Sequence, residues 1–231
     1  MPVPPLTEFL KSTVLFHGLP PAILQRASQR LVVRQHGAGA TLVLEQDWGD
    51  SVYLLIQGWV KVQTRSRDGR DIILNILGPG NLFGEMASLE SSPRASDVVT
   101  LTPVTVGSLP AADFWDLINT EPQVGFRLAQ LLVKRIQQLN RRLQVRESDS
   151  RARLADVLLF LAEGQGQVQS GGVLIPNLAH RELGGLCGLS RETVTRVLKQ
   201  FEQEGLLVRS DPEHFYLPDR RGLEAVVEGS R

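Results

Sequence analysis

Short apolar runs alternate with turn-forming residues between positions 41 and 109. Each run has the length of a β-strand, as at 52–56, 60–62 and 72–77. Glycine, aspartate, asparagine or proline separates the runs, at 48–50, 57–58, 67–69 and 78–81. Strand-length runs that are interrupted this often are typical of a small all-β sandwich or barrel. We therefore expect a β domain here, preceded by helical residues 6–31 that Gly18 and the prolines at 20 and 21 interrupt.

The spacing of the apolar residues changes from residue 122 onward. Leucine and isoleucine now recur at steps of 4, 4, 3 and 4, at Leu128, Leu132, Ile136, Leu139 and Leu143. This near-heptad row predicts a long helix over residues 122–147. The other faces of that helix carry lysine and arginine, and so narrow an apolar row favours a partner helix over a broad domain core. We predict a parallel homodimer through this helix; the alternative is that the row packs on the chain's own β domain.

The last third of the chain begins at a predicted hinge. Ser148 or Asp149 is a good N-cap for a helix over 151–162. Residues 164–172 are rich in glycine, glutamine and serine, which predicts a loop. Two helix patterns follow, with Gly188 between them, and then a predicted hairpin; they lie at 177–185, 190–203 and 207–217. Two short helices joined by a glycine-containing turn fit a helix-turn-helix.

The second of these helices carries candidate DNA-reading residues near its start. Ser190 is placed to cap it, Arg191 and Glu192 occupy the first turn, and Arg196 follows about one turn later. The N-terminal part of a recognition helix meets base edges in the major groove, where arginine pairs with guanine and a carboxylate accepts from cytosine. Thr193 and Thr195 suit phosphate or methyl contacts, so the candidate DNA-binding set is Ser190, Arg191, Glu192, Thr193, Thr195 and Arg196.

Two further interpretations bear on this helix. We expect its buried face to consist of Val194, Val197, Leu198 and Phe201. The alternative for Arg191 and Glu192 is a solvated helix start, where an acidic residue is favoured by the helix dipole.

A second group of chemically suggestive residues lies between positions 80 and 96. Gly80 and Gly84 permit tight backbone geometry. A helical turn over 85–89 would offer free N–H groups to an anion, and Arg94 is a bidentate phosphate donor. Glu85 accepts hydrogen bonds when ionised, as a ribose hydroxyl requires. A cyclic 3′,5′-nucleotide combines one phosphate charge with a free 2′-hydroxyl; the alternative is an Arg94–Glu85 ion pair on a turn.

Two stretches resemble a known family. The run Phe-Gly-Glu-Met-Ala followed by Pro-Arg-Ala is similar to the phosphate-binding cassette of cyclic-nucleotide-binding domains. The run Gly-Leu-Ser-Arg-Glu-Thr-Val resembles the winged helix-turn-helix of the Crp/Fnr regulators, in particular their cyclic-AMP receptor branch. The resemblance covers about residues 14–220. It implies an α+β fold with a jelly-roll-like, cyclic-nucleotide-binding β-roll at 1–112, a long dimerisation helix at 113–148 and a winged helix-turn-helix at 149–231.

The resemblance also implies roles for particular residues. Gly84 and Glu85 would hold the ribose, while Arg94, Ala95 and Ser96 would hold the cyclic phosphate. The candidate ligand residues of this segment are Gly84, Glu85, Met86, Ala87, Arg94, Ala95 and Ser96. In the bacterial receptor a Thr-Ser pair on the long helix contacts adenine across the dimer. The comparable stretch here is Gln-Gln-Leu-Asn at 137–140, so Gln138 and Asn140 are the candidates for a base contact.

The function implied is that of a bacterial, dimeric transcription regulator gated by a cyclic nucleotide, with cAMP as the expected effector. Arg191, Glu192 and Arg196 would read a TGTGA-like palindrome in double-stranded DNA, and RNA polymerase would be a further partner. One alternative keeps the fold but replaces cAMP by another small ligand or by constitutive DNA binding. An alternative of another class is a cyclic-nucleotide-binding regulatory subunit that acts on a protein partner.

Composition limits the remaining functions. The 231 residues carry a formal net charge of +0, which argues against coating nucleic acid by bulk charge but permits a local basic patch. Cys187 is the single cysteine, so a disulfide framework, a cysteine-rich metal site and an iron–sulfur cluster are excluded. We expect Cys187 to pack as a small apolar residue. None of the four histidines lies in the 84–96 segment, which argues against haem.

Targeting and catalytic motifs are also missing from the sequence. Residues 1–10 lack a basic stretch followed by an apolar one, and no uncharged apolar run approaches about 18 residues. Together with the single cysteine, this predicts a cytoplasmic protein with no membrane partner. There is no Gly-x-Ser-x-Gly, no Walker lysine and no His-Glu-x-x-His, so we expect neither catalytic residues nor a catalytic metal.

Overall fold

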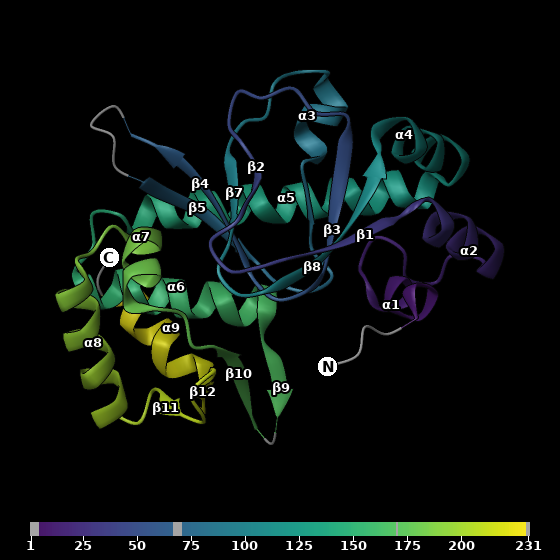
Figure 1. Ribbon diagram of the computed structural model, residues 1–231. Coiled ribbons are helices and arrows are strands. Elements are labelled where there is room, and N and C mark those ends of the chain that lie inside the picture. Colours follow the sequence, from purple (N-terminus) through teal and green to yellow (C-terminus); the bar gives the residue numbers. More distant parts are fainter. Residues whose placement is uncertain (1–4, 67–70, 170, 230–231) are drawn as a thin grey trace. The chain divides into compact units, whose positions relative to one another are not determined.

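The computed structural model describes residues 5–66, 71–169 and 171–229 (Figure 1). The turn predicted at 67–69 lies outside these described residues. The chain divides into two compact units, residues 1–64 with 74–133 and residues 65–73 with 134–231. The long helix α5 (Pro122–Val145) contributes residues to both units.

The first unit is built on two β-sheets, as expected for a β-roll. One sheet has the order β1-β8-β3-β6 and the other the order β2-β7-β4-β5. Strand β3 pairs antiparallel with β8, and β8 pairs antiparallel with β1. The strands are β1 (Val32–His36), β2 (Thr41–Val43), β3 (Ser51–Gln57), β4 (Val60–Arg65), β5 (Asp71–Leu77), β6 (Leu82–Phe83), β7 (Asp97–Thr100) and β8 (Val104–Pro110).

The surroundings of strand β3 explain why its apolar residues form a continuous run and do not alternate with polar ones. Successive side chains of a strand point to opposite faces of the sheet. Leu55 packs between the two sheets with Val60 and Val98, whereas Leu54 belongs to a second core formed with helices. Both faces of β3 are therefore covered, and each position in the middle of the strand favours an apolar residue.

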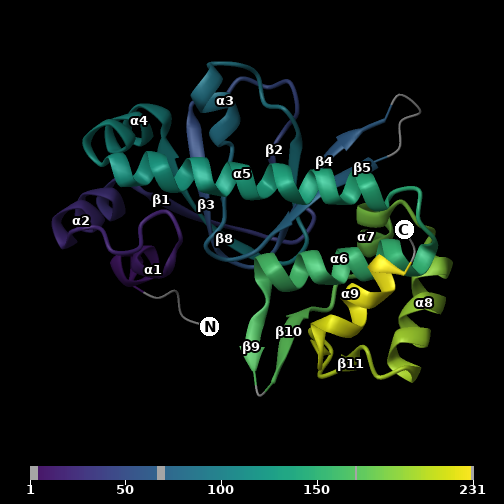
Figure 2. The same cartoon turned by 180° about the vertical axis from the view of Figure 1, so that it is seen from behind.

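Helices cover the outer face of the sheet that contains β3. Helices α1 (Leu6–Ser12), α2 (Pro21–Arg30) and α4 (Ala111–Thr120) lie together beside the strands (Figures 1 and 2). Their apolar residues, with the beginning of α5, form one core cluster with residues of β3. Leu10 and Phe114 are completely buried in it. Gly18 and Pro20 lie between α1 and α2, as the sequence predicted.

Two elements of this unit had no counterpart in the predicted pattern. Strand β1 begins at Val32, before the region expected to be β, and most of its side chains are exposed. It is held by backbone pairing with β8, so no alternation of apolar and polar residues marks it. The single long helix implied over 113–148 is divided: residues 111–120 form the separate helix α4, and the long helix starts only at Pro122, where proline is favoured at the first turn.

The apolar row of α5 divides into two parts. Leu128 is buried in the core of the first unit, and Leu132 packs partly against that core. Ile136, Leu139 and Leu143 are 57%, 43% and 64% exposed. The alternative that the row packs on its own β domain therefore holds for its beginning, while its end leaves large apolar side chains in solvent.

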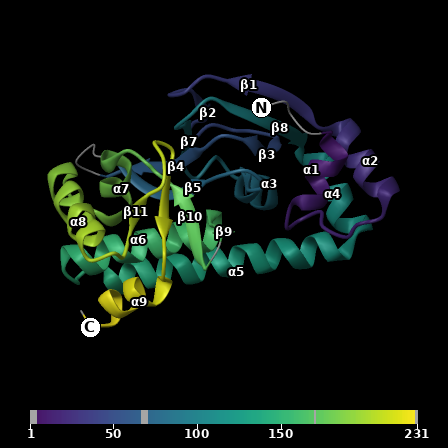
Figure 3. The ribbon, with the colours of Figure 1, turned by 90° about the horizontal axis from the view of Figure 1, so that it is seen from below.

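The second unit is assembled around helix α6 (Ser150–Gln165), which contacts helices α7, α8 and α9 (Figure 3). Leu154, Leu158 and Leu161 are completely buried. The N-cap is Asp149, whose carboxylate accepts the N–H groups of Arg151 and Ala152 at 2.8 and 2.9 Å. The other helices are α7 (His180–Cys187), α8 (Arg191–Gln203) and α9 (Arg220–Glu228).

A small sheet completes this unit, in the order β11-β12-β10-β9. The predicted hairpin is present as β11 (Val208–Arg209) and β12 (His214–Leu217). The loop predicted over 164–172 is wrong, because α6 continues to Gln165 and β9 (Gln167–Gln169) pairs with β10 (Gly172–Pro176). The side chains of β9 are exposed, so backbone pairing rather than apolar burial holds this strand.

The described residues contain neither a candidate membrane-spanning helix nor a candidate metal-binding cluster. Within 5–66, 71–169 and 171–229, no helix is both long and apolar enough to cross a membrane. The same residues contain no group of three or more histidine, cysteine, aspartate or glutamate side chains arranged to hold a metal ion.

Candidate ligand site and nucleic-acid interface

The segment expected to bind phosphate contains the short helix α3 (Glu85–Glu90), which confirms the predicted helical turn. Gly84 stands at its N-cap with φ 80° and ψ 2°, in the left-handed region. A side chain there would be strained, and its Cβ would also meet the guanidinium of Arg94 and the ring of Tyr53. Glycine at this position therefore permits both the turn and the close approach of Arg94.

Arg94 is the central cation of this segment. It is buried, with 4% of its surface exposed. One terminal nitrogen donates to the carbonyl oxygen of Gly84 at 2.7 Å, and the other donates to that of Ser51 at 2.8 Å. The guanidinium carbon lies 5.7 Å from the centre of the Tyr53 ring. A guanidinium carries five N–H donors, so two such bonds leave hydrogens available for a phosphate.

The loop between β2 and β3 holds the backbone of Arg94 in place. The N–H of Arg94 donates to the carbonyl of Asp47, and the N–H of Gln46 donates to the carbonyl of Arg94, both at 2.9 Å. A Cβ on Gly49 would collide with the guanidinium. Gly49 and the carbonyl of Ser51 were not foreseen as parts of the site. The turn signal at 48–50 marked the loop, but nothing in the sequence indicated that it faces Arg94.

The other residues that were expected to bind the ligand lie at the start of α3 or directly after Arg94. Glu85 is the first residue of α3 and is 2% exposed. Ala87 is buried, Met86 is 54% exposed, and Ala95 and Ser96 follow Arg94 directly on the way to β7. The structure therefore brings Gly84, Glu85 and Arg94 together around the N-terminus of α3.

Gln138 and Asn140 lie on α5, in the part of that helix assigned to the second unit. Gln138 is half-buried and Asn140 is exposed. Because the phosphate segment belongs to the first unit, their role toward a base stays a prediction.

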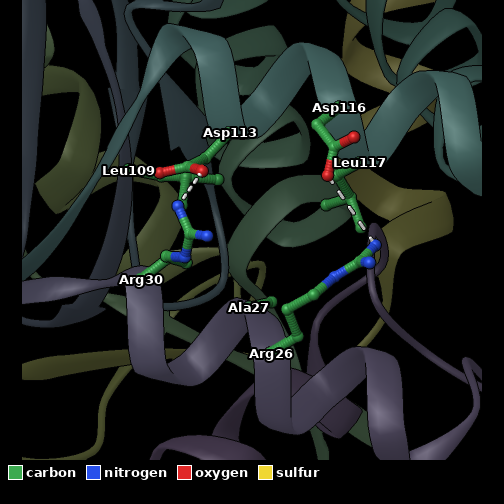
Figure 4. Close-up of a pocket in the computed structure, with 7 residues that line it drawn as sticks. All are labelled: Arg26, Ala27, Arg30, Leu109, Asp113, Asp116 and Leu117. Atoms are coloured by element: carbon green, nitrogen blue, oxygen red, sulfur yellow. Dashed lines mark hydrogen bonds and ion pairs between the residues drawn. The ribbon is translucent and has the colours of Figure 1, made fainter.

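A pocket elsewhere in the first unit has a different character (Figure 4). It lies between α2 and α4, where Arg30 pairs with Asp113 at 2.5 Å and Arg26 lies 3.9 Å from Asp116. Its volume of about 30 Å³ holds water molecules but not a nucleotide. Both arginines face a carboxylate, so this pocket joins two helices and offers no uncompensated cation to a phosphate.

Helix α8 has the two faces that the sequence predicted. Val194, Val197, Leu198 and Phe201 are all completely buried. The exposed residues include Arg191, Glu192, Thr195 and Arg196. Ser190 caps the helix, its hydroxyl accepting the N–H of Thr193 at 3.2 Å. Two arginines and one carboxylate thus stand on the solvent side of the first turns of one helix.

The helix start also sets the charge state of Glu192. Its pKa lies below the usual range because its own backbone N–H and the Ser190 hydroxyl bond to the carboxylate. The side chain is therefore ionised at neutral pH and acts as an acceptor, as a cytosine amino group requires. Thr193 lies 3.1 Å from the Ser190 hydroxyl, so it contributes to the cap.

The turn between α7 and α8 is held from α6. Gly188 has φ 65°, and Arg153 donates through Nε to the carbonyl of Cys187 at 2.9 Å and through a terminal nitrogen to that of Gly188 at 2.9 Å. The thiol of Cys187 is buried and lies 3.0 Å from the carbonyl of Leu183. Burial raises the pKa of this thiol to about 11. Cys187 therefore packs as a small, protonated core residue, as predicted.

Comparison with known proteins identifies the families of the two regions that contain these residues. Residues 33–121 match the model of the cyclic nucleotide-binding domain, and residues 152–226 match the model of the Crp-like helix-turn-helix domain. The chain is 31% identical over 202 residues to a "CRP-like cAMP-activated global transcriptional regulator" of Mycobacterium tuberculosis, covering 87% of this chain and 90% of that one. It is 32% identical over 222 residues to a "Cyclic AMP receptor protein" of Thermus thermophilus, covering 95% and 99%.

Solved structures agree as well. The catabolite activator protein of Thermus thermophilus matches with a TM-score of 0.53 at 31% identity, over 95% of this chain and all of that one. The sequence and the fold thus point to regulators of transcription rather than to enzymes. The chain belongs to the Crp/Fnr family of cyclic-nucleotide-binding transcription regulators.

Proposed function

We propose that the protein is a homodimeric regulator whose binding to a TGTGA-like palindrome is gated by cAMP. The observation that carries the ligand half is the buried guanidinium of Arg94, enclosed by Gly49 and Gly84 and held at the N-terminus of α3. A buried cation that keeps spare donors suits a single phosphate charge. The names of the Mycobacterium tuberculosis and Thermus thermophilus relatives, each more than 30% identical to this chain, both specify cAMP, which supports this effector.

Each ligand residue has a proposed task. Arg94 and the backbone of Ala95 and Ser96 hold the cyclic phosphate, while Gly84 and Glu85 hold the ribose. The first N–H groups of α3, at Met86 and Ala87, add partial positive charge near the anion. Gln138 and Asn140 on α5 are the proposed partners of the base.

The DNA half rests on the exposed side of α8. Arg191, Glu192 and Arg196 are proposed to contact base edges, and the remaining polar residues of the first turns, Ser190, Thr193 and Thr195, to support phosphate contacts or pack against a thymine methyl group. Arginine is the commonest partner of guanine, and an ionised glutamate accepts from cytosine, so this trio suits the G·C pairs of a TGTGA half-site.

The dimer is proposed to form through α5, because Ile136, Leu139 and Leu143 expose large apolar side chains at helical spacing. A palindrome then follows from the twofold symmetry of the protein, with recognition helices about 34 Å apart.

We propose that segments 1–112, 113–148 and 149–231 act as sensor, dimer helix and DNA reader. Ligand binding would shift the dimer contact and reorient the DNA-reading segment that follows Asp149. A coupling free energy of about 1 to 3 kcal/mol between ligand binding and DNA binding is enough for a useful switch. We place this regulator in the cytoplasm, with RNA polymerase as its further partner.

The test is fluorescence anisotropy of a labelled duplex that carries TGTGA-N6-TCACA, measured with and without cAMP. Binding should tighten on adding cAMP by roughly 5- to 150-fold, the range of ordinary allosteric coupling. Arg94→Ala should abolish the response. Arg34→Ala is the matched control, because Arg34 is an exposed arginine on β1 of the same unit and should leave the response intact.

Other outcomes select the alternatives. Tight binding that does not depend on cAMP would retain the DNA reader and indicate another ligand or constitutive binding. No specific binding in either condition, with cAMP affinity preserved, would favour a regulatory subunit that acts on a protein partner.

A further inference from the structure

His180 is a histidine that neither proposed site uses. It is the first residue of α7, and its ring is half-buried. Its Nδ1 lies 2.7 Å from the hydroxyl oxygen of Thr195 on α8. The ring therefore joins the two helices of the helix-turn-helix at the exposed side of α8, where Arg191 also stands.

The hydrogen bonds of Thr195 define which ring nitrogen carries the proton. The Thr195 hydroxyl donates to the carbonyl of Arg191, one turn earlier, at 2.9 Å. A hydroxyl has one hydrogen, so toward His180 the Thr195 oxygen acts as an acceptor. Nδ1 of His180 then carries a hydrogen and donates it. In the neutral ring, Nε2 is left as an acceptor, which repels a phosphate oxygen; in the protonated ring, Nε2 becomes a charged donor.

We propose that His180 is a positioning residue for Thr195 and α8, and that its protonated ring adds a contact to the DNA phosphate backbone. This inference rests on the proposed DNA-binding function. In the neutral state the ring only orients Thr195. Protonation keeps that bond and gives Nε2 a hydrogen and a positive charge, so operator binding takes up a proton and strengthens as the pH falls.

The charged groups around the His180 ring are consistent with operator binding that strengthens as the pH falls. Arg191 and Glu202 face it from α8 and Arg209 faces it from β11. Glu202 is itself paired with Arg209 at 2.6 Å. Partial burial, followed by the positive charges of Arg209 and Arg191, lowers the pKa of His180, while the carboxylate of Glu202 opposes that shift. In the free protein the His180 ring is therefore neutral at pH 7. A phosphate that approaches the ring would raise its pKa and so favour its protonation.

Arg181, next to His180 on α7, has its own partner. Its guanidinium lies 3.0 Å from the carboxylate of Glu182. Because this charge is balanced locally, His180 is the group at the start of α7 whose charge can change with binding.

The experiment measures the affinity of the full-length protein for the labelled TGTGA-N6-TCACA duplex at saturating cAMP, from about pH 8 to about pH 6 at constant ionic strength. Affinity should rise roughly tenfold over this range, since each protomer gains one charged phosphate contact. The plot of log K against log salt should steepen by about two at the acid end, which is about 0.9 for each new contact.

One variant separates the positioning role of the His180 ring from its titration, and a second variant is the control. His180→Asn keeps an amide donor where Nδ1 stands but cannot titrate, so its affinity at pH 8 should match that of the native protein while its pH dependence disappears. His214→Asn is the matched control, because His214 is the histidine of the hairpin and pairs with Asp211 at 3.0 Å. That variant should keep the pH dependence.

A pH-independent affinity for the palindrome, or a pH response that survives in His180→Asn, would overturn the inference and leave the proposed function standing. Absence of palindrome binding at every pH would overturn both. Nitrogen-15 NMR of the free protein gives a separate readout: a neutral His180 ring protonated at Nδ1 supports the inference, and one protonated at Nε2 contradicts it.

Discussion

Arg94 and the two glycines beside it illustrate how single residues shape the ligand site. The guanidinium occupies space that a β-carbon at either Gly49 or Gly84 would fill. The chain thus keeps the cation at the N-terminus of α3 by omitting side chains around it. Gly49 is assigned no ligand contact in the proposed function, yet it helps to decide where the guanidinium of Arg94 lies, as Gly84 does.

Gly49→Ala should therefore weaken cAMP binding by at least tenfold and destabilise the first unit by about 1 to 3 kcal/mol, as overpacking of a well-filled site does. Calorimetric titration with cAMP and thermal unfolding measure the two effects. Gly37→Ala is the matched control, because a β-carbon at Gly37 meets no atom within 4 Å. Equal cAMP affinity for both variants would show that Arg94 can move aside without loss.

The thiol of Cys187, also a single residue, leads to a prediction of how the free energy of unfolding depends on pH. Burial raises the pKa of its thiol from about 9 to about 11. The folded state therefore favours the protonated thiol, so this contribution to stability is fully present below pH 9 and is lost as the pH rises through 11. The loss amounts to at most about 2 to 3 kcal/mol.

Guanidinium unfolding at pH 8 and at pH 10.5 should show this loss in the native protein and a smaller one in Cys187→Ala. Iodoacetamide should modify the native thiol far more slowly than the thiol of the unfolded chain, because the thiolate is the reactive form. Rapid alkylation of the folded protein at pH 8 would contradict the burial of this side chain.

At the scale of elements, the start of α6 depends on its cap. Asp149 satisfies two of the backbone N–H groups that the first turn of a helix leaves without a partner. Helix α6 is the central helix of the second unit, so loss of the cap is felt by the whole unit. The cap was predictable from the sequence because its effect is local.

Asp149→Ala should lower the free energy of unfolding of the second unit by about 1 kcal/mol, the usual cost of losing an N-cap. Asp149→Ser should restore most of it, since a serine hydroxyl also accepts from the first turn. Chemical denaturation followed by circular dichroism measures both. An alanine variant as stable as the native protein would mean that water replaces the carboxylate without cost.

The contacts of α5 with α6 could not be predicted in the same way. The sequence predicted that lysine and arginine cover the other faces of the long helix, and one of these residues, Arg141, lies 2.7 Å from both Asp156 and Glu163. Asp156 is buried, and this burial raises the pKa of its carboxyl group, against the effect of Arg141 and Arg142. Which charges meet depends on how two helices pack, and the spacing of residues along either helix does not contain that information.

At the scale of the whole molecule, the exposed end of the α5 row is the feature that a second copy would cover. Three large apolar side chains there lie in solvent, and a heptad-like row is the pattern that two helices bury against each other. Dimerisation would place two α8 helices on one DNA molecule, so loss of the dimer should cost most of the operator affinity.

Ile136→Glu combined with Leu139→Glu should convert the dimer to monomers at micromolar concentration and weaken palindrome binding by at least a hundredfold, because one half-site then binds alone. Sedimentation velocity and anisotropy measure the two quantities. Val168→Glu, at an 86% exposed position on β9, is the control and should remain dimeric. A double variant that stays dimeric would exclude this face of α5 as the interface.

The sequence by itself determined the elements whose signals are local or periodic. These are the strand-length runs of the β-roll, the long helix, the caps at Asp149 and Ser190, and the buried face of α8. The candidate residues Arg94 and Arg191 were also found in this way, since their neighbours in sequence are their partners in the motif. Strands β1 and β9 were missed because their side chains are exposed and only backbone pairing holds them.

The tertiary structure decided the contacts between residues that are distant in the chain. It placed Gly49 and the carbonyl of Ser51 around Arg94, and it joined His180 to Thr195. The physical reason is that hydrogen bonds and close packing depend on distances in space, which folding sets for many residues at once. A periodic pattern reports which face of an element is buried, but not which residue of another element covers it.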